Sequence, residues 1–105
     1  MPTRTPRMAQ IEALLIDDPV DPFLRYSLAL EHASAGDDPA AADHLLRLIA
    51  DTPYVPAFLM AGQILNRLNR VDEASATLRR GIEVARQQGE SHAEGEMAGL
   101  LSSIE

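Results

Sequence analysis

Residues 58–78 read FLMAGQILNRLNRVDEASATL and predict two helices joined by a tight turn. In the first half, small and apolar residues recur at spacings of three and four, which places them on one helical face: Phe58, Ala61, Gly62 and Leu65. In and beyond the second half, apolar residues recur every four positions: Ala74, Leu78 and Ile82. Asn69-Arg70 separates the two patterns, because asparagine tolerates the left-handed backbone conformation that closes a helix.

Small residues occupy the places where the two predicted helical faces meet: Ala61, Gly62 and Ala74. Because these residues have little or no side chain, the two backbones can approach closely. The segment is therefore predicted to form an antiparallel helical hairpin. One hairpin cannot bury its own apolar faces, so we expect further hairpins of the same kind beside it.

Helix-start and helix-stop residues divide the rest of the chain. Three more helices are predicted to begin at a capping residue followed by proline, whose missing N–H costs nothing there: Thr5-Pro6, Asp21-Pro22 and Asp38-Pro39. Pro56 opens a helix without such a cap, and helices are predicted to stop at Gly36 and Gly89. A polar tail, Met1–Arg4, precedes the first helix. No segment shows the strict alternation of a strand, so the chain is predicted to be all-α.

The last predicted helix begins at a capping box, Ser91–Glu94. In this motif the serine oxygen accepts a hydrogen bond from a backbone N–H, and the glutamate reaches back to the start of the helix. Gly95 and Gly99 lie inside the helix, and each costs up to about 1 kcal/mol relative to alanine. We therefore expect this helix to be the least stable.

Length, composition and charge limit the classes of function. The 105 residues predict one domain, and the apolar content of 46% argues against disorder. The net charge of -7 argues against binding to nucleic acid and to anionic membranes, because both need clustered cations. The chain has no cysteine and hence no thiolate metal site. The apolar run Ala13–Ile16 is too short for an export signal or a membrane span, so we expect a cytoplasmic protein.

The sequence repeats itself with a period of about 34 positions. Residues 44–56, HLLRLIADTPYVP, align with residues 10–22, QIEALLIDDPVDP. Farther along, four sites have counterparts at nearly the same spacing: Leu28-Ala29 at Ala61-Gly62, Gly36 at Asn69, Ala41 at Ala74, and Leu45 at Leu78. A helix–turn–helix unit of this period is typical of the tetratricopeptide repeat. The chain resembles that family from about Pro22 to Gln88.

The matches to the family motif lie at its small residues, and the departures lie at its aromatic residues. The Leu-Gly pair of the family corresponds to Leu28-Ala29 and Ala61-Gly62, and its small alanine to Ala41 and Ala74. The early tryptophan of the family is replaced by Arg25 in the first repeat and by Phe58 in the second. The resemblance implies an all-α fold of about six helices, in which antiparallel helical hairpins stack as a short right-handed solenoid.

The resemblance also divides the chain. It implies one domain, residues 1–105, with a leading helix at 5–18, a first repeat at 22–54, a second repeat at 55–88 and a C-terminal capping helix at 91–105. The outer face of that last helix is polar, which modestly favours a capped monomer over a homodimer.

Residues that could carry out catalysis are few and scattered. His32, His44 and His92 show no metal-binding spacing. The acidic pairs Asp17-Asp18 and Asp37-Asp38 lie beside predicted helix boundaries, where we expect them to cap backbone N–H groups. We therefore expect no catalytic residue, no metal, no cofactor and no enzymatic activity. A helical-bundle enzyme using His32 or His44 with a nearby acid is a much weaker hypothesis.

The family resemblance implies where a partner would bind, because the first helix of each repeat lines a groove in such proteins. The corresponding residues form an apolar and aromatic floor with a polar rim: Phe23, Tyr26, Leu30, Leu59, Gln63, Asn66 and Arg67. Arg67 is the candidate to meet a carboxylate of the partner. Tyr26 and Leu30 replace two of the Lys and Asn residues with which chaperone-binding members clamp a C-terminal carboxylate, so we do not expect that activity. Alternatively, Phe23, Tyr26 and Leu30 are core residues without a ligand.

Two functions follow as hypotheses. In the first, the chain is a non-catalytic module that binds a peptide or partner protein, of unknown identity, in this groove. In the second, it is a self-associating structural module, because the open ends of a short repeat array can stack on other copies.

Overall fold

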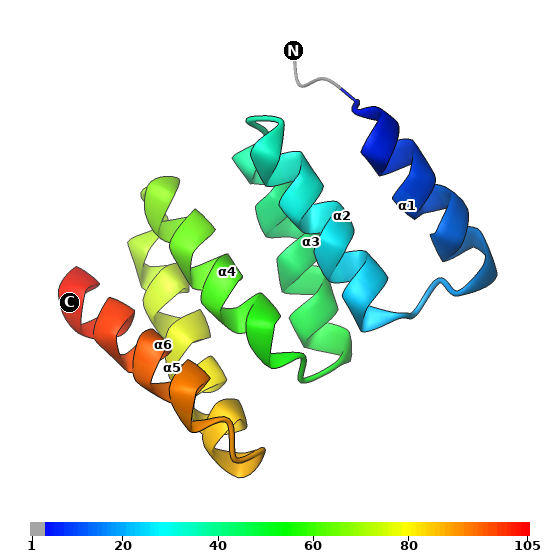
Figure 1. Cartoon of the computed structure of the whole chain (residues 1–105). Helices are drawn as coiled ribbons and strands as arrows, with labels where there is room; N and C mark the ends of the chain where they lie inside the picture. The colour runs from blue at the N-terminus through cyan, green and yellow to red at the C-terminus, as the bar shows by residue number, and fades with distance from the viewer. Residues whose placement is uncertain (1–3) are drawn as a thin grey trace. The chain divides into compact units, whose positions relative to one another are not determined.

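The computed structural model describes residues 4–105, which form six α-helices and no strand (Figure 1). The helices are α1 (Pro6–Asp17), α2 (Pro22–Ser34), α3 (Asp38–Asp51), α4 (Val55–Arg67), α5 (Val71–Gln87) and α6 (Ser91–Ile104). The predicted all-α class of about six helices is confirmed. Of the predicted polar tail Met1–Arg4, residues 1–3 lie outside the described residues.

The chain divides into two compact units. The first unit ends at Thr52 and contains α1, α2 and α3, and the second runs from Pro53 to Glu105 and contains α4, α5 and α6. Within each unit, helices that follow one another in sequence pack side by side (Figure 1). The boundary lies next to the predicted junction of the two repeats at residues 54 and 55. That residues 1–105 form a single domain stays a prediction.

Side-chain caps begin the three helices of the first unit. The Thr5 hydroxyl accepts a hydrogen bond from the Met8 N–H at 3.1 Å, and the Asp21 carboxylate accepts one from the Leu24 N–H at 2.9 Å. Both caps were predicted from the sequence. In α3 the prediction was wrong by one residue, because Asp37 and not Asp38 is the cap.

The acidic pairs thus differ in role. The Asp37 carboxylate accepts a hydrogen bond from the Ala40 N–H at 3.2 Å, whereas Asp38 is already the first residue of α3. Asp17 and Asp18 lie at the C-terminal end of α1, where the free backbone groups are carbonyls and a carboxylate cannot act as a cap. The prediction that Asp17-Asp18 caps N–H groups is therefore wrong.

Residues with positive φ close the two hairpins. Gly36 has a φ of 84° and Asn69 a φ of 60°, as predicted for Asn69. After α4, the Arg70 N–H donates to the Leu65 carbonyl at 2.9 Å, and the Asn69 N–H donates to the Asn66 carbonyl at 3.0 Å. This pair of bonds satisfies carbonyls that the end of a helix leaves unpaired, and it turns the chain back on itself.

The predicted capping box of α6 is absent. Ser91 is the first helical residue, and Glu90 precedes the helix without a side-chain cap. The Glu94 carboxylate instead lies 3.0 Å from Nη2 of Arg86, which projects from α5. The prediction was wrong because an ion pair between two helices competes with a local hydrogen bond for the same carboxylate.

The core of the first unit joins α1 to α2. Met8 and Ile11 of α1 form a buried cluster with Leu28 of α2, and Leu15 and Ala35 pack against it. A hydrogen bond also joins the start of α1 to α2: the Thr5 hydroxyl donates to the Glu31 carboxylate at 3.1 Å.

Two polar pairs join α2 to α3. Nη1 of Arg25 lies 3.0 Å from Oδ2 of Asp51, and the rings of His32 and His44 stack with their centroids 4.9 Å apart and their planes inclined by 14°. Both pairs are centred on Asp38 in the sequence, because antiparallel helices pair residues symmetrically about a point near their connection.

In the second unit, glycines allow the helices to approach closely. A Cβ at Gly81 of α5 would lie 2.6 Å from Phe58 Cβ on α4 and 2.6 Å from Met97 Sδ on α6. A Cβ at Gly62 of α4 would lie 2.4 Å from Leu78 Cδ2 on α5. Phe58, Leu78 and Met97 are all fully buried, so these contacts form the centre of the unit.

Replacing Gly81 with alanine is expected to destabilise the protein by about 1–2 kcal/mol. Overpacking a core costs about 1–3 kcal/mol, and the better helix propensity of alanine returns up to about 1 kcal/mol. Gly99→Ala is the matched control, because a Cβ at Gly99 has no neighbour within 4 Å. That control is expected to gain up to about 1 kcal/mol. Urea unfolding of both variants gives the comparison, and equal effects of the two substitutions would contradict the packing argument.

The surroundings of His44 lower its pKa below the ordinary value of 6.5. The largest cause is burial, which disfavours the charged ring. The positive charges of His32, Arg47 and Arg25 act in the same direction, and the carboxylate of Asp43 opposes them. His44 is therefore held neutral in the folded protein at pH values where a solvated histidine is already protonated.

Lowering the pH from about 7.5 to about 5.5 is expected to lower the free energy of unfolding. The unfolded chain takes up a proton at residue 44 near pH 6.5, before the folded protein does. His44 therefore makes its full contribution to the free energy of unfolding above about pH 6.5. That contribution is lost as the pH falls through the lower pKa that His44 has in the folded state. Urea unfolding at each pH measures this loss. His44→Gln is expected to reduce it, whereas the control His92→Gln, at an exposed residue, is expected to retain it.

Candidate functional site

The three binding residues predicted on α2 share one face of that helix. At about 100° per residue, Phe23, Tyr26 and Leu30 fall within about 60° of one another. Phe23 is 62% exposed, and Tyr26 and Leu30 are half-buried. Leu28, which joins α1 in the core, lies on the opposite side of α2. The alternative that Phe23 is a core residue is therefore wrong.

The four binding residues predicted on α4 also share a face, within about 100° of rotation. Leu59, Gln63 and Asn66 are half-buried, and Arg67 is exposed. An apolar residue near the start of the helix is thus followed by polar residues towards its end. The helices α2 and α4 belong to different units. That the two sets line one groove stays a prediction.

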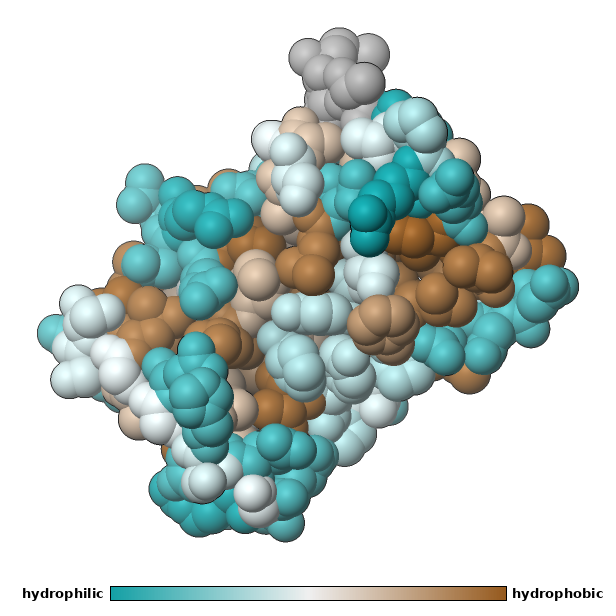
Figure 2. Space-filling view, in the orientation of Figure 1, coloured by the Kyte–Doolittle hydropathy of each residue, from teal (hydrophilic) through white to brown (hydrophobic). Residues whose placement is uncertain are grey.

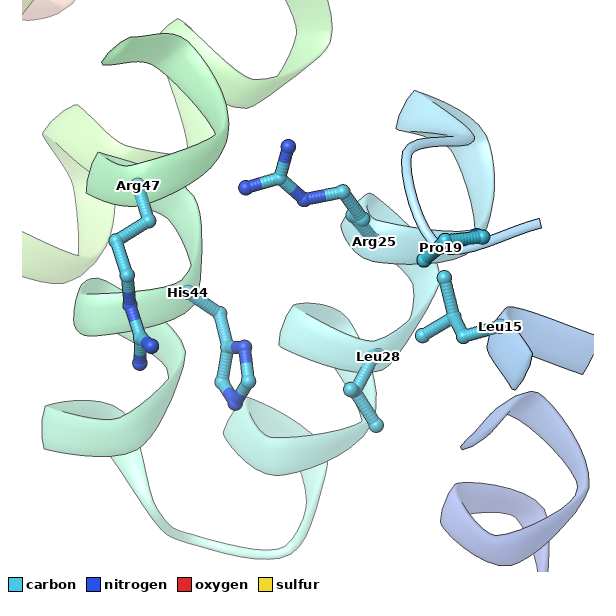
Figure 3. A pocket seen from close by; sticks show the side chains of 6 residues that line it. All are labelled: Leu15, Pro19, Arg25, Leu28, His44 and Arg47. Carbon is cyan, nitrogen blue, oxygen red and sulfur yellow. The ribbon is translucent and has the colours of Figure 1, made fainter. Parts of the chain in front are cut away.

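The first unit contains a pocket of about 220 Å³ on another side of α2 (Figure 3). Leu15 of α1 and Pro19 of the α1–α2 connection form one wall together with Leu28 of α2. We call these three residues the apolar wall. Leu28 is buried in the core cluster, and Leu15 packs against that cluster, so the core of the unit holds this wall in place.

The rest of the pocket is formed by ionisable side chains: Arg25 of α2 and His44 and Arg47 of α3. We call these three residues the cationic wall. Figure 3 shows the His44 ring lying between the Arg47 side chain and Leu28, with the Arg25 guanidinium above it in the view. Around α2, Leu28 lies about 160° and Arg25 about 100° from Tyr26, and no residue of the predicted binding face lines the pocket.

The pocket was not predicted from the sequence, although one signal for it was present. Antiparallel pairing about Asp38 places Arg25 opposite Asp51 and His32 opposite His44, as the structure confirms. The same register puts Arg25, His44 and Arg47 on neighbouring turns of the hairpin. The apolar wall also needs Leu15 of α1. The position of Leu15 depends on how α1 packs on α2, and the pairing of α2 with α3 does not predict that packing.

Neither a cluster of metal ligands nor a membrane-spanning helix is present in the described part of the chain. Among residues 4–105, no group of three or more His, Asp or Glu side chains is placed to hold a metal ion. None of the helices formed by these residues is long and apolar enough to cross a bilayer.

No protein-family model matches the sequence, and neither does any curated protein. Two solved structures of a tetratricopeptide repeat domain protein from Salinibacter ruber are similar to it. The crystal structure is 33% identical with a TM-score of 0.76, and the match covers 80% of this chain and 94% of that one. The solution NMR structure is 35% identical with a TM-score of 0.78, and the match covers 83% of this chain and 89% of that one.

Sequence and structure lead to the same family. Counterparts at a regular spacing mark the repeat, each unit contains an antiparallel hairpin, and the similarity to the Salinibacter ruber protein extends over four-fifths of the chain. The chain belongs to the tetratricopeptide repeat family.

Proposed function

We propose that this protein is a non-catalytic interaction module that binds a peptide or partner protein through the predicted faces of α2 and α4. The observation that carries the proposal is the exposure of Phe23, an aromatic residue at the start of α2, beside half-buried Tyr26 and Leu30. Exposed aromatic residues next to partly buried apolar ones are typical anchors of protein interfaces.

Family membership supports the same proposal, because tetratricopeptide repeat domains are typically interaction modules without catalytic activity. Along the predicted face of α4, Leu59 offers an apolar contact, Gln63 an amide and Arg67 a cation. Such a face suits an extended or helical segment that ends in, or carries, a carboxylate. A cytoplasmic location remains part of the proposal.

Selection from a random peptide library followed by calorimetry tests this function. Phe23→Ala is expected to lower the affinity for the selected peptides at least tenfold, because an anchor residue contributes about 2 kcal/mol or more to the binding free energy. The same substitution should change the stability by no more than about 0.5 kcal/mol, since Phe23 is largely exposed.

Val71→Ala is the matched control, because Val71 is an exposed apolar residue of α5 outside the predicted faces. It is expected to leave the affinity unchanged. Peptides that bind Phe23→Ala and the parent protein equally well would rule out the α2 face as the binding surface.

Self-association is the second candidate, and exposed apolar residues at one end of the first unit favour it. Leu14 and Ile16 near the end of α1 are 56% and 80% exposed, and Val20 in the α1–α2 connection is 73% exposed. Figure 2 shows hydrophobic surface over this end of α1 and the connection that follows it. Exposed apolar patches of this kind mark contact surfaces more often than single exposed residues do.

Under this candidate, light scattering coupled to size exclusion is expected to give a mass that rises with concentration towards that of a dimer. Replacing Ile16 and Val20 together with glutamate should return the monomer mass, because each charge would have to be buried in the contact. Val71→Glu, which lies in the other unit, should leave the dimer intact. A monomer mass at every concentration would exclude self-association.

A further inference from the structure

The cationic wall of the pocket is only partly neutralised. Among residues 4–105, no carboxylate lies within ion-pair distance of Arg47, whose Nε donates to the Asp43 carbonyl of its own helix at 3.4 Å. The ring of His44 stacks on His32 and forms no ion pair with a described residue, although the carboxylates of Asp43 and Glu12 are near enough to act on it. Arg25 differs, since it pairs with Asp51. Within the described residues, Arg47 and His44 thus lie side by side without an ion pair to an acid, in a chain with a net charge of -7.

The apolar wall faces these cations across a small space. The volume of about 220 Å³ holds about seven groups the size of water and is below the range of about 300–1,000 Å³ usual for drug-sized ligands. A ligand that fills the pocket therefore has few atoms. It must present an anion to the cationic wall and hydrocarbon to the apolar wall, because a wholly polar anion would leave the partly exposed Leu15 in contact with water.

We propose that this pocket binds a carboxylate carried on a short aliphatic chain, with the carboxylate between Arg47 and His44 and the chain against the apolar wall. Planar guanidinium groups bind carboxylates through charge-assisted hydrogen bonds, and an imidazolium adds a further donor. Two sources share this chemistry, namely a free short-chain carboxylic acid and the C-terminal residue of a protein chain.

The proposal is independent of the proposed function. The pocket is lined on α2 by Arg25 and Leu28 and not by Phe23 or Tyr26, and it is formed within the first unit alone. Loss of peptide binding in Phe23→Ala therefore says nothing about the pocket, and loss of ligand in a pocket variant says nothing about the α2 face.

Titration with pentanoate, followed by NMR of the histidine rings, tests the site. Pentanoate has about the size that the volume allows. We expect saturable shifts of His44 with a dissociation constant of about 1 mM, since so small a ligand cannot bind tightly. Pentanamide, which has the same shape without the charge, should cause no such shifts at the same concentrations.

Bound pentanoate should also raise the pKa of His44, because a carboxylate favours the charged ring. Affinity is therefore expected to be higher at about pH 5.5 than at about pH 7.5. The other charged or titratable groups around His44 come from each of the three helices: Glu12 of α1, Arg25 and His32 of α2, and Asp43 and Arg47 of α3. An unchanged pKa of His44 at saturating pentanoate would contradict the placement of the carboxylate.

Arg47→Gln tests the cationic wall directly. Arg47 is exposed, so the variant should fold, and the loss of one charge-assisted hydrogen bond is expected to lower pentanoate affinity at least tenfold. Arg79→Gln is the matched control, because Arg79 is an exposed arginine of the second unit that pairs with Glu105. Equal affinity in Arg47→Gln and the parent protein would overturn the proposal.

Two further ligands test the apolar wall and the source. Inorganic phosphate is expected to bind more weakly than pentanoate, and equal binding would contradict a role for the apolar wall.

N-acetyl-glycyl-valine with a free carboxylate is compared with its amide. Tighter binding of the free acid than of pentanoate would identify a protein C-terminus as the source, and weaker binding would identify a free acid. Failure of both carboxylates to bind would overturn the proposal.

Discussion

The close approach of three helices at Gly81 is the constraint on which the second unit depends. Phe58 of α4 and Met97 of α6 meet α5 at a residue that has only a hydrogen for a side chain. At Gly62, α4 comes equally near to Leu78 of α5. Protein cores are close-packed, and a side chain at Gly81 would press on Cβ of Phe58, which moves only with the backbone of α4. At Gly62 the nearest atoms belong to the end of the Leu78 side chain, so that site can adjust more locally.

In the first unit, different residues occupy the positions that correspond to this close contact. In the alignment of the two repeats, Arg25 takes the place of Phe58, and Leu48 takes the place of Gly81. Where the second repeat fits an aromatic ring against a glycine, the first therefore has a fully buried leucine and an arginine. The arginine cannot enter an apolar core without a partner, so it pairs with Asp51 beside the pocket. Arg25, at the place that Phe58 has in the second repeat, is thus one of the residues that line the pocket.

Features set by neighbouring residues could be predicted from the sequence, and features set by distant ones could not. Thr5 and Asn69 act on backbone groups within a few residues, so their roles follow from local chemistry. The capping box failed because Glu94 has a partner on another helix, Arg86. The side of α2 that carries Phe23 was predicted from the family resemblance, and the structure leaves Phe23 62% exposed there. The pocket could not be predicted in this way, because its walls are formed by side chains from three different helices.

Leu28 and Tyr26 lie on opposite sides of α2, so we expect the pocket and the predicted binding face to act separately. Exposed charges are screened over about 10 Å at an ionic strength of about 0.1 M, so the carboxylates that matter for the pocket are the near ones: Asp51 paired with Arg25, and Asp43 and Glu12 near His44. In the first unit, α1 and α3 each pack on α2, and the pocket is where residues of all three helices meet. A ligand there would add contacts between α1 and α3 and stabilise the unit by mass action. Its effect on the face of Phe23 could then come only through the rigidity of α2, since no pocket residue lies on that face.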